Sequence, residues 1–505
     1  MVLEQNLSLV NKIDRLLRWG HWFTFFNVLL ALVVTGSYFL ADPLPQSAIG
    51  WIYLLFTWLG HTAFICFLFF IITIFPVSLI FPYQRHVRGL AASLATGGFV
   101  ALIFDAYVYH SLGYHAGSAS YEQTLDLLRQ QVVTNLRNFV LITAAVAALL
   151  LWLQLVLSNF CWKKIARLGH SGVGKPALVL LLGSFVFSHL LHIWGDASQN
   201  DAITRQDNIL PFSYPATART MLARYNLLET SANATELQQN WLQPAALRQL
   251  PVQLSCAAAA NTAPVHLILL NKLTTVQQAQ LKQLGLRPMN THFAPVAKTQ
   301  AVDNLLYADM AQNETQKAPD WLKQLPPGYV AFYAGNNWQQ QLPWLKTQKT
   351  STTALLHWHL LDNDDELTPL LQQANDGPLL VLELQGQSDK FALGAAAFWY
   401  RWPQLQQMRI SDVTQHLDIL PTLLAELGCY NQQNWSGDNL LQPQSQTKLN
   451  ILNNQLYSFR KDKMLVVEED GSFSVWSAGT AVRLEQRLDL PMLTDALKRL
   501  PSQQP

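Results

Sequence analysis

The sequence predicts a bundle of five membrane-spanning α-helices followed by an α/β domain outside the membrane. Only 13% of the 505 residues are charged, about half the usual fraction, and charge is scarcest in the first part of the chain. Five stretches there are apolar over the roughly 20 residues that a helix needs to cross a bilayer. After them, short apolar strands alternate with amphipathic helices, the pattern of a mostly parallel sheet with helices on both faces. The net charge is +1, and no basic stripe is interleaved with aromatic residues, so no nucleic-acid partner is expected.

The predicted spans share a high content of aliphatic and aromatic residues and cover residues 22–40, 51–79, 90–107, 139–157 and 177–194. Lysine and arginine are concentrated before the first span and in the loops after the second and fourth. Such residues stay on the cytoplasmic side, so we expect a cytoplasmic amino terminus. Everything after Trp194 should then lie on the far side, which is the periplasm of a bacterium whose inner membrane holds the protein. We divide the chain into a five-span transmembrane domain (1–195), a periplasmic connector (196–263) and a periplasmic domain (264–505).

Polar residues in and near the spans each have two interpretations. Asp105 could lie on a proton path or at the wet level of the headgroups, and we favour the second because it is near the edge of the hydrocarbon. His189 and His192 share a helix face. They could bind a metal, but interhelical hydrogen bonds are favoured because no further ligand is spaced to join them. The polar stretch 111–131 predicts a separate helix across the mouth of the bundle.

The periplasmic domain is predicted from its short elements. Strands are expected over the apolar stretches 265–270, 328–334, 353–361, 377–384 and 395–402, and helices over the amphipathic stretches 275–284, 367–374 and 417–428. A hairpin is expected over 465–478, with its turn at Asp470-Gly471. Cys256 and Cys429 could form a disulfide in an extracytoplasmic domain, and the sequence leaves that open.

The strand ends give little support for catalysis. The sequence contains neither a GxSxG nor a GxxxxGK[ST] motif. The first strand is followed by Asn271-Lys272, where metal-dependent chemistry would need carboxylates or histidines and where a lysine would oppose a cation. His357 and His359 point to one strand face. They could hold a metal, although a solvated strand face is the commoner case.

Two groups of motifs resemble known families. The stretch SDVTQHLDILPTLLAELG (411–428) with GDNLL (437–441) resembles the late segment of sulfatases and other alkaline-phosphatase-superfamily enzymes. The membrane half resembles the YejM/PbgA family of inner-membrane proteins at RLLRWGHWFTFFNVLLAL (15–32), GHTAFICFLFFIITIFPVSLI (60–80), HIWGDA (192–197) and ILPFSYPATAR (209–219). The resemblance implies a membrane α-helical bundle of five spans followed by an α/β periplasmic domain of the sulfatase/alkaline-phosphatase fold, in a shorter and degenerate member.

The resemblance also implies a function. It is that of a non-catalytic sensor of lipopolysaccharide (lipid A) or another anionic phospholipid, which regulates lipopolysaccharide synthesis by restraining the membrane adaptor LapB and hence the protease FtsH. The residues implied in lipid binding lie in the connector and are Tyr214, Pro215, Thr217, Ala218, Arg219, Thr220 and Arg224. A helix cap at Thr217 with Arg219 beside it would suit a phosphate. Thr220 stands where the family has a second basic residue, and Arg224, one turn on, could compensate. Alternatively, Arg219 only snorkels to any anionic headgroup.

The same resemblance implies a dismantled catalytic site. Asn271 stands where active sulfatase-type enzymes carry a metal-binding aspartate, and Thr299 is the nearest match to their nucleophile. The stretch LQGQSDKF (384–391) has no histidine where a metal ligand is expected. We therefore expect a pseudoenzyme without metal or cofactor. Two alternatives stay open: a metal-dependent hydrolase or transferase acting on lipid headgroups, and a periplasmic protein that carries anionic lipids such as cardiolipin.

Overall fold

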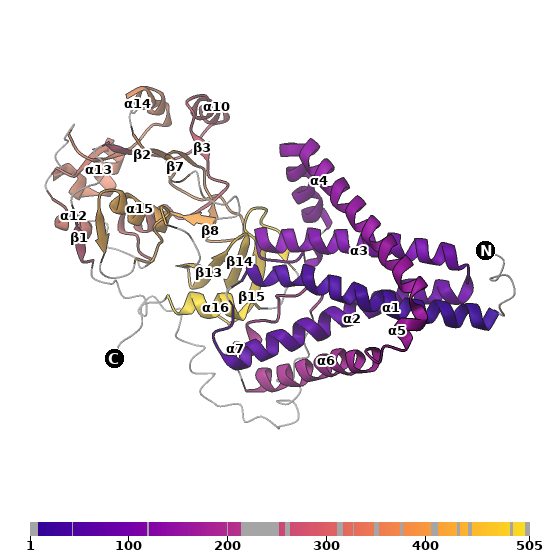
Figure 1. Cartoon of the computed structure of the whole chain (residues 1–505). Coiled ribbons are helices and arrows are strands. Elements are labelled where there is room, and N and C mark those ends of the chain that lie inside the picture. Colours follow the sequence, from indigo (N-terminus) through magenta and orange to yellow (C-terminus); the bar gives the residue numbers. More distant parts are fainter. Residues whose placement is uncertain are drawn as a thin grey trace. The chain divides into compact units, whose positions relative to one another are not determined.

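The structure, a computed structural model, divides into two compact units (Figure 1). One comprises Met1–Ser231 with Asp489–Pro491, and the other Ala232–Leu488 with Met492–Pro505. We name them the membrane unit and the α/β unit. The residues that the structure describes are 9–42, 44–118, 121–198, 200–213, 252–257, 263–310, 317–326, 328–347, 353–373, 377–403, 405, 413–431, 435–442, 447–484 and 488–499.

The membrane unit contains the five long apolar helices that the sequence predicts. The candidate spans are Val10–Leu40, Ala48–Ile80, Gln84–Leu112, Arg137–Lys163 and Gly174–Ala197. They belong to the long helices α1 (Leu9–Thr35), α2 (Ala48–Ile80), α3 (Gln84–Leu112), α4 (Tyr121–Lys163) and α6 (Gly174–Ala197). Short helices lie between them, namely η1 (Gly36–Leu40), η2 (Ala116–Ser118) and α5 (Ile165–Gly169), and α7 (Asp201–Thr204) follows the last span. Many large apolar side chains on the spans are exposed, as side chains that face lipid must be.

The helix before the fourth span differs from the prediction. We expected a separate helix over 111–131, but α4 is one continuous helix of 43 residues that begins at Tyr121. Between Tyr121 and the span, the sequence contains no glycine or proline that would end a helix. The polar turns and the span therefore form one element.

Close packing fixes α2 against α6. A Cβ atom built at Gly60 would lie 2.5 Å from the backbone of Phe185, so only glycine allows the two helices to approach this closely. Near the other end of the bundle, the indole N–H of Trp19 donates to the carbonyl of Ser158 at 3.0 Å and joins α1 to α4. These contacts hold α2 against α6 and α1 against α4.

The α/β unit is built on a six-stranded sheet with the strand order β3-β9-β7-β2-β6-β5. Its strands are β2 (Val265–Leu270), β3 (Arg287–Pro288), β5 (Val330–Ala334), β6 (Leu356–Leu360), β7 (Leu379–Glu383) and β9 (Phe398–Arg401). β2 pairs in parallel with β6 and β7, and β5 with β6, so the mostly parallel sheet is confirmed. The strand expected over 395–402 forms β9, which is antiparallel to β7.

Helices cover both faces of this sheet. Leu267 and Leu269 of β2 belong to the core on one face, whereas Ile268 and Leu270 belong to the core on the other, because alternate strand residues point in opposite directions. The helices on the first face are α11 (Lys298–Val302), α12 (Asp320–Gln324), α13 (Asn336–Gln341) and α15 (Ile419–Glu426). Those on the second are α10 (Thr275–Gln283) and α14 (Leu367–Gln373). The three expected helices are thus confirmed.

Three smaller sheets complete the unit. Their strand orders are β10-β4-β8, β1-β11 and β12-β13-β14-β15-β16. The strands are β1 (Leu254–Cys256), β4 (Thr291–Pro295), β8 (Leu393–Ala395), β10 (Val413–Gln415), β11 (Cys429–Asn431), β12 (Lys448–Leu452), β13 (Gln455–Arg460), β14 (Lys463–Val467), β15 (Phe473–Ser477) and β16 (Arg483–Leu484). Among the described residues of the unit, the other helical segments are η4 (Asp303–Tyr307), η5 (Pro343–Thr347), η6 (Asp364–Glu366), η8 (His416–Asp418) and α16 (Leu490–Leu497). The expected hairpin over 465–478 is confirmed as β14 and β15.

A disulfide closes one edge of the unit. Cys256 of β1 and Cys429 of β11 stand opposite each other in an antiparallel pair and are bonded. They are 173 residues apart in sequence, so the bond ties the start of the unit to a late strand. A disulfide is typical of proteins in an oxidising compartment.

Candidate functional site

The turn after β2, where metal-dependent chemistry would need a ligand, is held by a carboxylate that follows the neighbouring strand. The backbone N–H groups of Asn271 and Lys272 donate to the Asp364 carboxylate at 3.0 and 3.2 Å. Asp364 follows β6, which lies beside β2. The side chains of Asn271 and Lys272 themselves are exposed. The strand end therefore has an acid nearby, but that acid caps a turn.

Two further carboxylates at the ends of parallel strands bind backbone. Glu383, the buried last residue of β7, accepts from the N–H groups of Leu273 at 2.8 Å and Ala397 at 3.0 Å. Asp362, after β6, accepts from the N–H of Asn337 at 2.9 Å. The role of Glu383 was missed in the sequence, although an acid at the end of an apolar strand was a signal for it. Thr299, the nearest match to a nucleophile, is exposed in α11.

A pair of buried histidines links β4 to η8. His292 Nε2 lies 2.9 Å from His416 Nδ1, and His416 Nε2 lies 2.9 Å from the carbonyl oxygen of Leu384. A carbonyl only accepts, so His416 donates from Nε2 and His292 donates to its Nδ1. Burial lowers the pKa of His416 to about 4 and that of His292 well below its usual value. Both rings are therefore neutral members of an internal hydrogen-bond chain.

The His-x-Asp turn that resembles sulfatases serves as a buried junction. Asp418 accepts from Lys448 Nζ at 2.6 Å and from the N–H groups of Gln415 and Asp438 at 2.8 Å. The side chains of Lys448 and Asp418 are 6% and 1% exposed. Arg499 forms an ion pair with Asp438. This arrangement ties η8 to β12 by a salt bridge that water does not reach.

His357 and His359 lie on one face of β6 as expected, and His266 of β2 joins them. The rings of His266 and His357 are stacked with centroids 4.6 Å apart, and His266 Nδ1 lies 3.4 Å from His359 Nε2. Burial, followed by the neighbouring histidine rings, lowers the pKa of His266 and His359 to about 4. Within the described part of the chain, no three His, Cys, Asp or Glu side chains are gathered in a way that could hold a metal ion.

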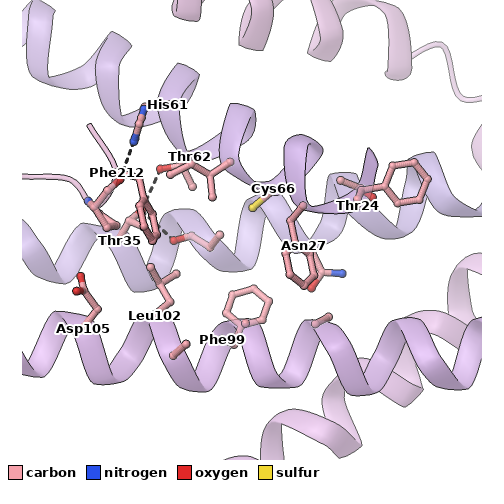
Figure 2. A pocket seen from close by; sticks show the side chains of 18 of the residues that line it. Thr24, Asn27, Thr35, His61, Thr62, Cys66, Phe99, Leu102, Asp105 and Phe212 are labelled. Atoms are coloured by element: carbon pink, nitrogen blue, oxygen red, sulfur yellow. Dashed lines mark hydrogen bonds between the residues drawn. The ribbon is translucent and has the colours of Figure 1, made fainter. Parts of the chain in front are cut away.

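The membrane unit contains a cavity of about 460 Å³. It lies between α1, α2 and α3, and its middle is walled by apolar side chains such as Cys66, Phe99 and Leu102 (Figure 2). Asn27 lies toward one end, and Asp105 with Phe212 toward the other. Apolar walls with a few polar groups at the ends are typical of a site for an amphipathic ligand.

The Asp105 end of the cavity is lined by a hydrogen-bond network. The Asp105 carboxylate accepts from the Tyr38 hydroxyl at 2.6 Å and from the Ala116 N–H at 2.7 Å, and His115 Nδ1 lies 2.7 Å away. Asp105 is 14% exposed, so the interpretation as a solvated residue is wrong. His115 Nε2 also faces the carbonyl oxygen of Asn208 at 3.0 Å. Since a carbonyl cannot donate, His115 donates there from Nε2.

Three histidines from separate elements hold the segment 200–213, and we name them the connector anchor: His61 of α2, His115 after α3 and His192 of α6. His61 Nε2 lies 2.8 Å from the carbonyl oxygen of Pro211, and His192 Nε2 lies 2.9 Å from Asp207 Oδ1. His189 instead bonds within its own helix, to the carbonyl of Phe185 at 2.8 Å, so interhelical bonding is wrong for that residue. The connector thus begins from a fixed position on the bundle.

The predicted lipid-binding residues are all in the next part of the connector. Tyr214, Pro215, Thr217, Ala218, Arg219, Thr220 and Arg224 lie outside the described residues. The described segment that precedes these residues, 200–213, ends at Ser213, one residue before Tyr214. The lipid site therefore stays a prediction, and the connector anchor is the described structure next to it.

Comparison with known proteins matches mainly the membrane half. Residues 6–252 match the family model described as a domain of unknown function, DUF3413. The chain is 30% identical over 242 residues to proteins of Salmonella typhimurium and Salmonella typhi, each described as inner membrane protein YejM. These alignments cover 48% of this chain and 41% of the relatives, so the match spans less than half the length of either protein.

A solved structure also shares some likeness. It is a protein in the alkaline phosphatase superfamily from Vibrio parahaemolyticus, with 8% identity and a TM-score of 0.32, and the match covers 53% of this chain and 94% of that one. A TM-score this low does not establish a shared fold. The assignment of this unit to the α/β fold class therefore rests on the strand order of its own six-stranded sheet.

Proposed function

This chain belongs to the YejM family of inner-membrane proteins, and from that membership we propose that it is a non-catalytic sensor of an anionic lipid, lipid A in particular. In this proposal the lipid phosphate binds the connector at Thr217 and Arg219, on the periplasmic side. The bound state then restrains a LapB-type adaptor and, through it, proteolysis by FtsH.

The connector anchor is the observation that carries the proposal. His61, His115 and His192 come from three parts of the bundle and hold one segment that leads directly into the proposed lipid-binding residues. Any ligand that shifts this segment must change hydrogen bonds to the bundle. Such a link is what a sensor needs, because its ligand must bind two states of the protein with different affinity.

The α/β unit supports a role without catalysis. The carboxylates of Asp364, Glu383 and Asp418 at the expected catalytic edge already accept hydrogen bonds from backbone N–H groups, and Asp418 also from Lys448. A metal ion would have to displace these internal donors. Metal-dependent hydrolysis of an aryl sulfate or a phosphodiester by the purified protein, lost on Asp364→Asn, would overturn this part of the proposal.

The disulfide supports the proposed orientation. Cys256 and Cys429 are bonded in the α/β unit, and disulfides persist in the periplasm but not in the reducing cytosol. With five spans, a periplasmic α/β unit requires a cytoplasmic amino terminus. Contact with a LapB-type adaptor would then take place in the membrane or on its cytoplasmic side.

The test compares Arg219→Ala with Arg137→Ala in the full-length protein. Arg137 is an exposed arginine at the start of the fourth span. A charge-assisted hydrogen bond to phosphate contributes about 1.5–3 kcal/mol, so we expect Arg219→Ala to weaken lipid A binding in nanodiscs by roughly tenfold or more. Arg137→Ala should leave binding unchanged.

Two results would count against a specific lipid site. One is equal binding of lipid A by both variants. The other is an equal loss of binding to lipid A and to phosphatidylglycerol on Arg219→Ala, because an arginine that only snorkels to anionic headgroups does not distinguish them. In cells, the Arg219→Ala protein should be present at the normal level while the amount of lipopolysaccharide changes.

A further inference from the structure

The cavity between α1, α2 and α3 has the length of one lipid leaflet. Its lining residues extend from Phe23 to Thr35 on α1, from His61 to Ile74 on α2 and from Ala91 to Asp105 on α3. At 1.5 Å of rise per residue, these stretches run roughly 18–21 Å along their helices. The hydrocarbon of a whole bilayer is about 30 Å thick, so the cavity reaches a little past the middle.

The walls suit a flexible hydrocarbon chain. The middle of the cavity is lined by Ile65, Cys66, Phe69, Ala95 and Phe99. At the deep end the Asn27 side chain is already bonded, since its amide donates to the carbonyl of Phe23 at 2.9 Å and its oxygen accepts from Gln154 at 2.6 Å. A cavity with apolar walls is a poor place for water, which needs polar partners.

The cavity is open toward lipid between α2 and α3. Phe69 on α2 and both Gly98 and Ala101 on α3 line the cavity and are exposed on helices that are candidate spans. A Cβ atom built at Gly98 would meet only Phe69, at 3.9 Å. Glycine at this position therefore leaves a gap through which a lipid can enter from the side.

We infer that this cavity binds one acyl chain of a bilayer lipid, which enters between α2 and α3. The carbonyl end of the chain lies toward Asp105 and Phe212, and the methyl end lies near Asn27 and Thr24. Phe212 lies in the segment that leads to Arg219. The cavity would therefore hold an acyl chain of the same lipid whose headgroup binds Arg219 in the proposed function. The inference does not depend on the proposed function, since any lipid with a chain of suitable length fits the same walls.

The test uses full-length protein in nanodiscs of phosphatidylglycerol that carries a diazirine midway along one acyl chain. After illumination, labelled residues are mapped by mass spectrometry. Phe99 and Asn27 are 6% and 7% exposed, so a chain reaches them only from inside the cavity. Ile72 is 66% exposed and reports contact with bulk lipid. We expect labels on Phe99 or Asn27 as well as on Ile72.

The matched variants are Gly98→Leu and Gly97→Leu. Gly97 is also exposed, does not line the cavity, and has open space around it. Gly98→Leu should lower the labelling of Phe99, relative to that of Ile72, by about tenfold, the loss expected if two methylene groups of the chain are no longer buried. Gly97→Leu should leave the ratio unchanged. Ala101→Leu fills the same opening and replaces Gly98→Leu if that variant does not fold.

The outcomes separate this inference from the proposed function. Labels on Ile72 without labels on Phe99 and Asn27, or the same ratio in Gly98→Leu and Gly97→Leu, would overturn the cavity site even if Arg219→Ala abolishes lipid A binding. Conversely, Phe99 labelling that persists in Arg219→Ala supports the cavity site even if lipid A binding never depended on Arg219.

Discussion

The edge of the parallel sheet and the Asp105 end of the bundle both gather acidic side chains, but they use them differently. At the sheet edge, Asp364 and Glu383 bind backbone N–H groups. At the bundle end, Asp105 binds Tyr38, His115 and Ala116 beside a cavity of about 460 Å³. The comparison teaches that residue types alone do not mark a site. The polar groups of the sheet edge hold the fold together, whereas those of the bundle end border a space that a ligand can fill.

The largest expected effect tests whether the polar groups of the α/β unit are structural. Lys448→Met would leave the Asp418 carboxylate buried without its cation, which costs about 3–5 kcal/mol in comparable buried pairs. Pulse proteolysis of the full-length protein in urea measures the free energy of unfolding of the α/β unit.

Lys323→Met is the control for Lys448→Met. Lys323 forms a salt bridge with Asp320 at 2.8 Å in which both side chains are mostly exposed, and such pairs contribute about 0–1 kcal/mol. If Lys448→Met destabilised the unit no more than Lys323→Met, the junction at Asp418 would not be structural.

The second prediction concerns acid. The pKa of the buried His416 is about 4 in the folded protein and about 6.5 when unfolded, so below pH 6.5 the unfolded chain binds more protons. The contribution of His416 to the free energy of unfolding should therefore be fully present above pH 6.5 and should decrease as the pH falls toward 4. At pH 5, about 2 kcal/mol of it should be lost. Calorimetry across this range should show a weaker pH dependence for His416→Asn.

The control for the acid prediction is His170→Asn. His170 is an exposed residue of the membrane unit whose Nδ1 bonds to the carbonyl of Ala166 at 2.7 Å. This substitution should leave the pH dependence as it is in the unsubstituted protein. An identical pH dependence in His416→Asn and His170→Asn would show that the buried pair His292–His416 does not set the acid sensitivity.

The smallest expected effect is at the connector anchor. His61→Leu removes the hydrogen bond to the carbonyl of Pro211, which contributes about 1 kcal/mol net. Opening of the segment 200–213 should then become about fivefold more frequent. Tryptic cleavage after Arg205, which lies inside the segment, measures it, and unchanged cleavage would mean that the segment is held without His61.

The sequence predicted those features that depend on neighbouring residues. Apolar length alone located the five spans, and the Asp470-Gly471 turn located β14 and β15. The strands β12 and β13 were missed, although Asn453 and Asn454 between them have φ values of 50° and 60° and an Asn-Asn pair is a signal for a two-residue hairpin turn. The continuous α4 was missed because its polar turns were treated as a separate element.

Local sequence patterns were thus enough to predict the five spans, the α/β alternation and the absence of a carboxylate at Asn271-Lys272, directly after the first strand. Only the tertiary structure decided what the polar residues do. Asp364 meets Asn271 across 93 residues of sequence and His61 meets Pro211 across 150, and no local pattern specifies such pairs. The cavity also exists only because of the tertiary structure. The space beside Gly98 depends on how three helices pack against one another, and not on the residues of any one helix.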